Sequence, residues 1–283
     1  MSNPDLYYFV NLETYPIDRL GSEAGQDLLN RAHRMMKKDT LVEFPYFLRP
    51  RAVGALTEEL TALDASAHRI DYMSTPYGWM DNSGFAPDHP RSALFRRNCG
   101  TITTELFSEH SLSQRLFRVD ELTEFVRRML GYETLYRSAC PVLSIQVNTM
   151  LGGDRFGWHF DTNDGVVSFM MQNADTGGAF EYVPLIRDED DENYDVMSNV
   201  FDGSHQPRRP AISVGTLSLF LGRRSIHRVA PVGATKRSRL SLLFSYDRAP
   251  GMVFPAKTCQ RITSPSDEPY LGALTKQEWL ARC

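Results

Sequence analysis

Apolar residues at helical spacing mark three segments in the first half of the chain. The first predicted helix begins after Ser22, which suits an N-cap, and ends near Lys38. The second follows Pro50, a residue that favours the first helical position. The third begins with Asp120 as its cap and stops at Gly131, which can adopt the left-handed conformation of a C-cap. The buried faces are expected to comprise Leu28, Leu29, Ala32, Met35 and Met36; Val53, Leu56, Leu60 and Leu63; and Leu122, Phe125, Val126 and Met129.

The segments around these helices lack a helical pattern. We expect an irregular or short-strand entry over residues 1–20 and a short aromatic strand over residues 43–48. Residues 66–100 interleave tyrosine, tryptophan and phenylalanine with proline and glycine, which predicts loops packed on a core.

After Pro141 the pattern changes from helical to alternating. Residues 144–150 alternate so that Ser144, Gln146 and Asn148 share one face of a strand. Further strands are predicted at 166–172, 179–183, 212–214, 216–221 and 240–246. They are interrupted by a polar insert over residues 187–210, whose acidic run at 188–192 is expected to be a solvated loop in a place where an insert can cover an active site.

Short strands separated by glycine-rich turns predict an antiparallel sandwich or barrel. The expected fold is therefore mainly β with flanking α: a jelly-roll, cupin-like core supported by an N-terminal helical layer. We expect one cooperative domain over residues 1–283, with a helical and loop support region (1–140), the jelly-roll core (141–248) and a C-terminal extension (249–283).

Composition narrows the class of protein. Hydrophobic residues make up 42% and charged residues 23% of the 283, as in ordinary soluble globular proteins. The formal net charge of −4 implies no broad basic surface, so nucleic acid is not an expected partner. The N-terminus lacks the features of a signal peptide and no apolar run reaches ~18 residues, so we expect no membrane partner and a cytoplasmic location. The four scattered cysteines predict neither a zinc site nor a disulfide framework.

The candidate chemistry begins with His159 and Asp161. Residues two apart on a strand lie on the same face, so one metal ion could be bound by both. His227, on a later predicted strand, offers a second imidazole. Two histidines and one carboxylate form the facial triad of non-haem Fe(II) oxygenases, which leaves coordination positions open for cosubstrate and oxygen. A polar surface strand is the alternative for the pair taken alone.

The run from Gln146 to Asp247 resembles the double-stranded β-helix of Fe(II)/2-oxoglutarate-dependent oxygenases. It contains the His-x-Asp pair, a Gly-Gly-x-Phe turn and strand at residues 177–180, and a distal histidine followed by Val-Ala-Pro-Val at 229–232. Arg239-Leu240-Ser241, twelve residues past the distal histidine, matches the Arg-x-Ser arrangement of the family. The resemblance implies Fe(II) and 2-oxoglutarate as cofactors and O2 as cosubstrate. It implies His159, Asp161 and His227 as metal ligands and catalytic residues.

The far carboxylate of 2-oxoglutarate requires a cation, and the planar fork of arginine binds a carboxylate through two hydrogen bonds. Alternation places Arg237 and Arg239 on one face of their strand, so both are candidates. We choose Arg239, because Ser241 two residues on could donate a second bond to the same carboxylate, and keep Arg237 in reserve.

One departure from the family concerns a tyrosine that many relatives carry about ten residues before the first metal histidine. Thr149-Met150-Leu151-Gly152 occupies that position here, so no phenol contacts the cosubstrate from it. Gln146 or Asn148 is the alternative contributor.

A closer resemblance lies in residues 158–164, 221–229 and 244–247, which are similar to a family acting on free amino acids. That family comprises radical halogenases of lysine and ornithine together with hydroxylase siblings. The halogenases have glycine where Asp161 stands, because the halide takes the vacated metal position. The carboxylate of Asp161 therefore implies hydroxylation.

The implied substrate is a free, basic amino acid such as lysine, ornithine or arginine. Arg96 or Arg97 could bind its carboxylate, although a solvated arginine pair is the alternative. Asp164, with Asn163 as a neutral alternative, could bind an amine, and Asn148 is a further substrate contact. The expected partner is thus a small molecule, and a homodimer is compatible with the sequence. The alternatives are a dioxygenase of peptides or natural products and a non-catalytic cupin-like binding protein.

Overall fold

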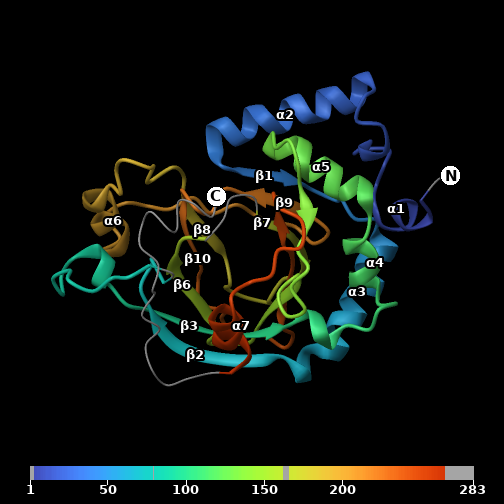
Figure 1. Ribbon diagram of the computed structural model, residues 1–283. Helices are drawn as coiled ribbons and strands as arrows, with labels where there is room; N and C mark the ends of the chain where they lie inside the picture. Colours follow the sequence, from blue (N-terminus) through green and yellow to red (C-terminus); the bar gives the residue numbers. More distant parts are fainter. Residues whose placement is uncertain (1–2, 79, 162–165, 265–283) are drawn as a thin grey trace.

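Antiparallel pairing joins ten strands into one curled sheet in the computed structural model, which describes residues 3–78, 80–161 and 166–264 (Figure 1). The strand order is β1-β9-β7-β11-β5-β3-β6-β10-β8, and β2 pairs with β3. The strands are β1 (Leu41–Phe44), β2 (His68–Ser74), β3 (Phe95–Ile102), β5 (Ile145–Met150), β6 (Arg155–His159), β7 (Val166–Gln172), β8 (Phe180–Val183), β9 (Leu217–Phe220), β10 (Ile226–Val229) and β11 (Arg239–Phe244). Two short strands, β4 (Tyr136–Arg137) and β12 (Tyr246–Asp247), pair separately.

The strand β3 connects the two halves of the sheet. Its Gly100–Ile102 end pairs with β5, and its Arg97–Asn98 part pairs with β6. The β1-β9-β7-β11-β5 half and the β6-β10-β8 half are thereby held in one curled structure. The prediction of a mainly β protein with a jelly-roll core is confirmed.

Seven α-helices surround the sheet in the described part of the chain. They are α1 (Pro4–Phe9), α2 (Glu23–Asp39), α3 (Pro50–Leu63), α4 (Leu112–Phe117), α5 (Asp120–Leu130), α6 (Tyr194–Phe201) and α7 (Ala256–Thr263), with short 3-10 turns η1 (Ile17–Arg19), η2 (Asp64–Ser66), η3 (Pro90–Ser92) and η4 (Thr104–Leu106). None of the described helices is long and apolar enough to cross a membrane.

The three predicted helices are confirmed, with one change at a cap and one on a buried face. Met35 of α2 was expected to be buried but is 44% exposed. The Ser22 hydroxyl accepts a hydrogen bond from the backbone N–H of Gly25 at 3.2 Å and caps α2. Gly131 ends α5 with a φ of 70°. Asp120 is not the cap of α5 but its first helical residue, since Val119 holds the cap position with an extended backbone. The Asp120 carboxylate instead lies 3.0 Å from Nη1 of Arg137.

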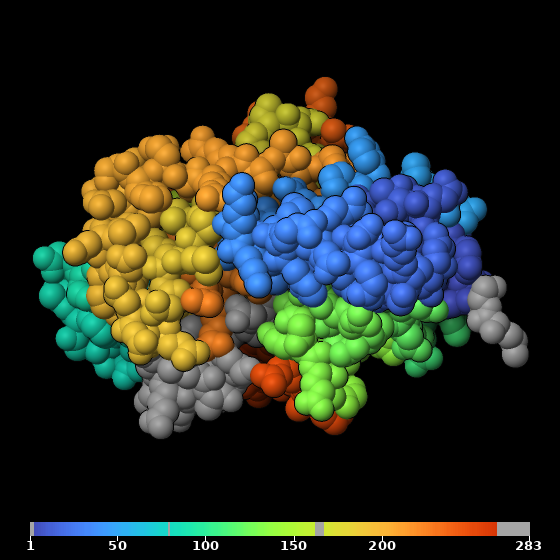
Figure 2. All heavy atoms as spheres, turned by 90° about the horizontal axis from the view of Figure 1, so that it is seen from above, coloured from blue at the N-terminus to red at the C-terminus, as the bar shows by residue number. Residues whose placement is uncertain are grey.

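The outer face of the larger half-sheet and the helices share the main hydrophobic core. Leu240, Leu242 and Phe244 of β11 point into this core, so Ser241 and Leu243 face the inside of the curled sheet. In Figure 2 the N-terminal helices and α5 lie together over one side of the molecule, and the insert that carries α6 lies at the other end. The helical layer therefore covers one face and leaves the inner face for the site.

The insert at 187–210 combines a solvated segment with a packed one. Residues 188–191 of the acidic run are exposed, as predicted for a solvated loop, whereas α6 packs on the sheet. Met197 and Val200 of α6 are buried in a second hydrophobic cluster with Trp158 and Ile226. Glu192, at the end of the acidic run, is buried with its carboxylate 3.2 Å from Nη1 of Arg187. The apolar residues of α6 are what bring the insert against β6 and β10.

Four predictions of element type or bounds were wrong. Residues 1–20 were expected as an irregular or short-strand entry but contain α1 and η1. β1 ends at Phe44 rather than continuing to residue 48, because the chain turns at Pro45 and Tyr46, whose φ is 56°. Residues 212–214 form no strand and lead into a turn at Gly215, where φ is 82°. Residues 66–100 were expected as loops but contain β2 and most of β3, which lengthen the sheet.

Truncation of Phe47 tests the main core. Phe47 is fully buried, its ring stacks on Phe125 at a centroid distance of 6.1 Å, and it also packs on Phe169 of β7. We expect Phe47→Ala to lower the free energy of unfolding by about 3–5 kcal/mol, measured by chemical denaturation. The neighbouring Tyr46 is 67% exposed, so Tyr46→Ala should change it by only about 0.5 kcal/mol. Equal losses in the two variants would contradict this packing.

Candidate active site

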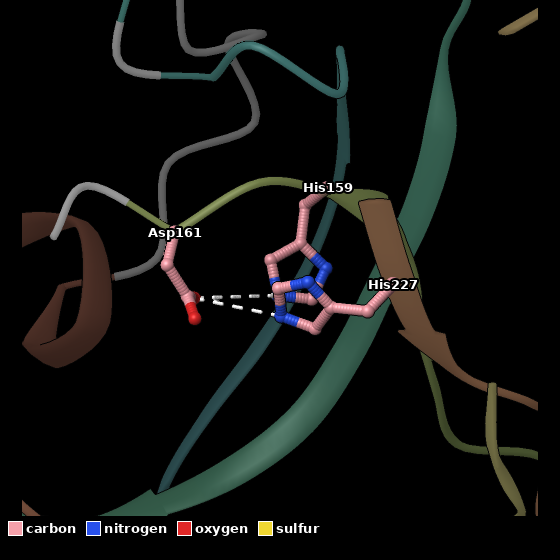
Figure 3. A group of neighbouring side chains, drawn as sticks. All are labelled: His159, Asp161 and His227. Carbon is pink, nitrogen blue, oxygen red and sulfur yellow. Dashed lines mark ion pairs between the residues drawn. The ribbon is translucent and has the colours of Figure 1, made fainter. Parts of the chain in front are cut away.

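The pairing of β6 with β10 brings the two candidate histidines together. His227 is the register partner of His159, and their ring centroids are 4.0 Å apart. Nε2 of His159 lies 4.0 Å, and Nε2 of His227 lies 3.5 Å, from Oδ1 of Asp161. Figure 3 shows the carboxylate directed at both imidazoles. The three residues foreseen in the sequence therefore meet at one point.

Both imidazoles have the tautomer that a metal ligand requires. Nδ1 of His159 is 2.8 Å from the carbonyl oxygen of Gly157, and Nδ1 of His227 is 3.0 Å from that of Ser225. A carbonyl only accepts hydrogen bonds, so each Nδ1 carries the proton and each Nε2 keeps its lone pair. Burial, together with the nearby His227, holds the pKa of His159 well below its usual range and keeps that ring neutral.

The segment that carries Asp161 is fixed from both sides. The backbone N–H of Phe160 donates to the carbonyl of Pro76 at 3.0 Å, and that of Asp161 donates to the carbonyl of Gly222 at 3.1 Å. The guanidinium of Arg187 lies 3.8 Å from the centroid of the Phe160 ring and so also packs on this segment. The carboxylate therefore has little freedom to leave its position.

This group of side chains fits a divalent transition metal. The ligand atoms of the three residues all lie within 4.8 Å of one another. Two imidazoles and one carboxylate on one side of an ion form a facial set, with further positions left open. In the described part of the chain no other group of three potential ligands comes this close.

A second polar feature of the interior is Arg239, at the start of β11. Its side chain is 4% exposed, and its Nε donates to the carbonyl of Gly178 at 3.0 Å. No carboxylate of the described residues pairs with it, and burial alone lowers its pKa to about 10, so it remains cationic at neutral pH. A buried cation without an acid is costly, so this position is a candidate site for an anionic group.

The structure separates the two candidate arginines of this strand. Arg237 precedes β11, its side chain is 59% exposed, and its Nε lies 3.2 Å from a carboxylate oxygen of Asp175. Ser241 lies two residues beyond Arg239, opposite Asn148 of β5. The two arginines were expected on one face because residues two apart in a strand share a face. That rule applies only within β11, which begins at Arg239 and leaves Arg237 outside it.

A cavity of about 150 Å³ opens beside the metal-ligand group. His159 and Asp161 line it together with Arg97, Gln146 and Asn148, three residues that the sequence proposed as contacts. Aromatic and aliphatic side chains form most of the remaining wall, including Phe95, Leu143, Phe156, Leu243, Phe254 and Ile262. The cavity therefore combines an apolar part of the wall with a polar part, and it is large enough for a small molecule.

The adjacent arginines of β3 take opposite faces. Arg97 is buried at the cavity wall, with its guanidinium carbon 3.8 Å from the centroid of the Phe156 ring. Arg96 is exposed, is not among the cavity residues, and its Nη2 lies 2.6 Å from the carboxylate of Asp71 on β2. Asn163 and Asp164 lie outside the described residues.

Sequence reasoning missed two contributors to the site. The Phe156 ring stacks on His159 with centroids 3.8 Å apart and planes 2° from parallel, so it supports a candidate metal ligand. Arg261 of α7 also lines the cavity, and its Nη2 donates to the hydroxyl of Ser74 at 3.1 Å. The helical spacing of Thr258, Arg261 and Ile262 was the available signal for α7, but spacing does not say where a helix docks.

Solved structures share this fold at low identity. An oxidoreductase of the 2OG-Fe(II) oxygenase family from Burkholderia pseudomallei is 17% identical, with a TM-score of 0.50 over 79% of this chain and 92% of that one. The epimerase SnoN, in complex with Fe3+, alpha ketoglutarate and nogalamycin RO, is 15% identical, with a TM-score of 0.55 over 88% and 96%. The carbocyclase SnoK from nogalamycin biosynthesis is 14% identical, with a TM-score of 0.51 over 84% and 91%.

These likenesses establish the fold, which is that of 2-oxoglutarate-Fe(II) oxygenases with a jelly-roll core. No curated protein is similar enough in sequence to count as a relative. The family model described as Halogenase D, in contrast, matches residues 24–250, which include the helical layer, the metal-ligand group and Arg239. The chain therefore belongs to the Halogenase D family.

Proposed function

We propose that this protein is an Fe(II)/2-oxoglutarate-dependent dioxygenase that hydroxylates an unactivated carbon of a free amino acid, with succinate and CO2 as coproducts. The observation that carries the proposal is the combination of a converging His-Asp-His group with a buried arginine that has no acidic partner among the described residues. Either feature alone would be compatible with several classes of protein. Together they provide for a metal ion and for the carboxylate of a cosubstrate.

The residues have separate tasks in this proposal. His159, Asp161 and His227 hold the metal, and Arg239 with Ser241 anchors the far carboxylate of 2-oxoglutarate through charge-assisted bonds. When bound, Fe(II) with 2-oxoglutarate and O2 supplies the oxidising power for the reaction. The apolar part of the cavity wall would position the carbon to be hydroxylated.

Hydroxylation, rather than halogenation, is favoured by Asp161. Its carboxylate provides the third protein ligand, so no position is left for a halide once the cosubstrate and O2 are accommodated. Membership of the family does not decide between hydroxylation and halogenation. It indicates the fold, whereas the choice between the two reactions depends on the residue at position 161.

The amino-acid carboxylate has a natural partner in Arg97, which is buried at the cavity wall, and Asn148 offers a neutral hydrogen-bonding group. The basic side chain expected from the sequence has less support. Among the described cavity residues the only carboxylate is Asp161, and Asp164 lies outside the described residues. We therefore propose a free amino acid as the substrate class and lysine, ornithine and arginine as the first candidates to test.

Loss of a metal ligand tests the metal centre. His227→Ala should abolish Fe(II)-dependent succinate formation and weaken Mn(II) binding at least ~10-fold, because one of three protein ligands is lost. Thermal unfolding and circular dichroism should show a folded protein. The exposed His205 of the insert is the control, since His205→Ala should leave both measurements unchanged. Full turnover in His227→Ala would exclude this ligand set.

Removal of the buried cation tests the cosubstrate site. Arg239→Met should raise the apparent KM for 2-oxoglutarate about 10- to 100-fold, as expected when a charged hydrogen-bonding partner is lost. Arg237→Met should change it less than about twofold, because Arg237 is exposed and paired with Asp175. Calorimetric titration with 2-oxoglutarate gives the same comparison without turnover. A larger effect at position 237 would show that the other arginine binds the cosubstrate.

A substrate panel tests the proposed class and outcome. Succinate release should be stimulated by at least one of lysine, ornithine or arginine more than by apolar amino acids, acidic amino acids or short peptides. The product should gain the mass of one oxygen even at high chloride. A chlorinated product would contradict hydroxylation, and faster turnover of a peptide or an apolar amino acid would contradict the substrate class.

The two arginines of β3 provide a matched control for the panel. Arg97→Met should lower kcat/KM for the best amino acid about 10- to 100-fold, whereas Arg96→Met should have little effect, because only Arg97 lines the cavity. Asp164→Asn should lower it only for basic substrates. Equal effects at positions 96 and 97 would exclude Arg97 as the carboxylate anchor.

A further inference from the structure

We infer that Gly222 is a positioning residue for the metal centre: its missing side chain is the space in which the Asp161 carboxylate lies. The inference rests on the proposed metal site. A Cβ atom at Gly222 would lie 1.9 Å from Oδ2 and 2.7 Å from Cγ of Asp161. Non-bonded carbon and oxygen atoms do not approach so closely, so any larger residue at 222 and the present carboxylate exclude each other.

Backbone conformation does not explain this glycine. Eight described glycines have a positive φ, and Gly222 is not one of them. A residue with a side chain could therefore adopt the same backbone geometry without strain at this position. The requirement for glycine comes instead from the close approach of Asp161.

The carboxylate cannot move aside without moving the chain. Asp161 is attached to the carbonyl of Gly222 itself through its backbone N–H at 3.1 Å, and the preceding N–H is held by Pro76. Its side chain has only two rotatable bonds, so a methyl group at 222 must turn the carboxylate away from the imidazoles or push the 222 segment outward. Either movement separates Asp161 from His159 and His227.

The position of Gly222 in the chain gives this contact a consequence for the reaction. It lies in the connection between β9 and β10, five residues before His227. The same short connection thus precedes the metal ligand His227 and, at Gly222, leaves space for the metal ligand Asp161. A side chain at 222 would leave a metal ion with two imidazoles, the same ligand set that results from glycine at 161. Residues 161 and 222 therefore determine together whether a carboxylate completes the metal site.

A double-mutant cycle separates this steric role from general damage to the loop. The variants are Gly222→Ala, Asp161→Gly and the double variant, with Gly54→Ala as control because a Cβ at Gly54 meets nothing within 4 Å. The measurements are the Co(II) affinity, by calorimetry, and the Tm of the metal-free protein. We expect Gly222→Ala alone to weaken Co(II) binding at least ~10-fold and to lower the Tm by at least ~2 °C.

In the Asp161→Gly background, Gly222→Ala should lower neither the Co(II) affinity nor the Tm, because the carboxylate that would clash with the new methyl group is absent. Equal losses in both backgrounds, or a Co(II) affinity of Gly222→Ala within about twofold of the unmodified protein, would overturn the inference. If Gly222→Ala alone does not fold, the double variant should fold, and its failure to do so would also overturn it. If the unmodified protein binds no Co(II), the proposed function is contradicted. The Tm values of the four proteins in the cycle would still test the steric conflict between residues 161 and 222, because they are measured without metal.

Discussion

The register between β6 and β10 is the constraint on which the site depends. With His227 opposite His159, the two imidazoles come within 4.0 Å although the residues are far apart in the sequence. A shift of one residue would turn one of the rings to the other face of the sheet. The register is held by burial, since Trp158 and Ile226 pack with α6 on the far side of the two strands. The insert is therefore part of what keeps the metal ligands together.

Electrostatics provides the second constraint. Arg239 is buried in the interior without an acid among the described residues, a state that is unfavourable in the absence of an anion. Nε of Arg239 donates one hydrogen bond, to the carbonyl of Gly178. Its two terminal nitrogens, Nη1 and Nη2, can therefore bind a ligand. This arrangement suits the proposed cosubstrate 2-oxoglutarate, whose far carboxylate would bind Arg239 while its other end binds the metal.

The sequence predicted the features that depend on local spacing. His159 and Asp161 are two residues apart, and Arg239 is followed by Ser241, so their relation survives folding with little change. Properties set by distant contacts were not accessible. The polar residues Arg96 to Asn98 do not look like a buried strand, yet they form part of β3 because β2, β5 and β6 pair with it. The docking of α7 against the cavity is another such property.

Burial also decided between residues that the sequence treated as equivalent. Alternation predicts opposite faces for Arg96 and Arg97 but not which face is inside, and that depends on the curl of the sheet. For Arg237 the alternation itself failed, because the strand begins two residues later. In both cases one arginine is paired with a surface aspartate and the other is buried.

The fold leaves the reaction open, since an epimerase and a carbocyclase share it with this chain. The difference must come from groups near the metal and from the way a substrate is placed. In this protein the carboxylate at 161 and the absence of a side chain at 222 occupy the same small volume. Replacing Asp161 with glycine would leave an empty space there as well as an open metal position. If the proposed function holds, we therefore expect that exchanging this one ligand would not be enough to change the outcome of the reaction, because the placement of the substrate would remain the same.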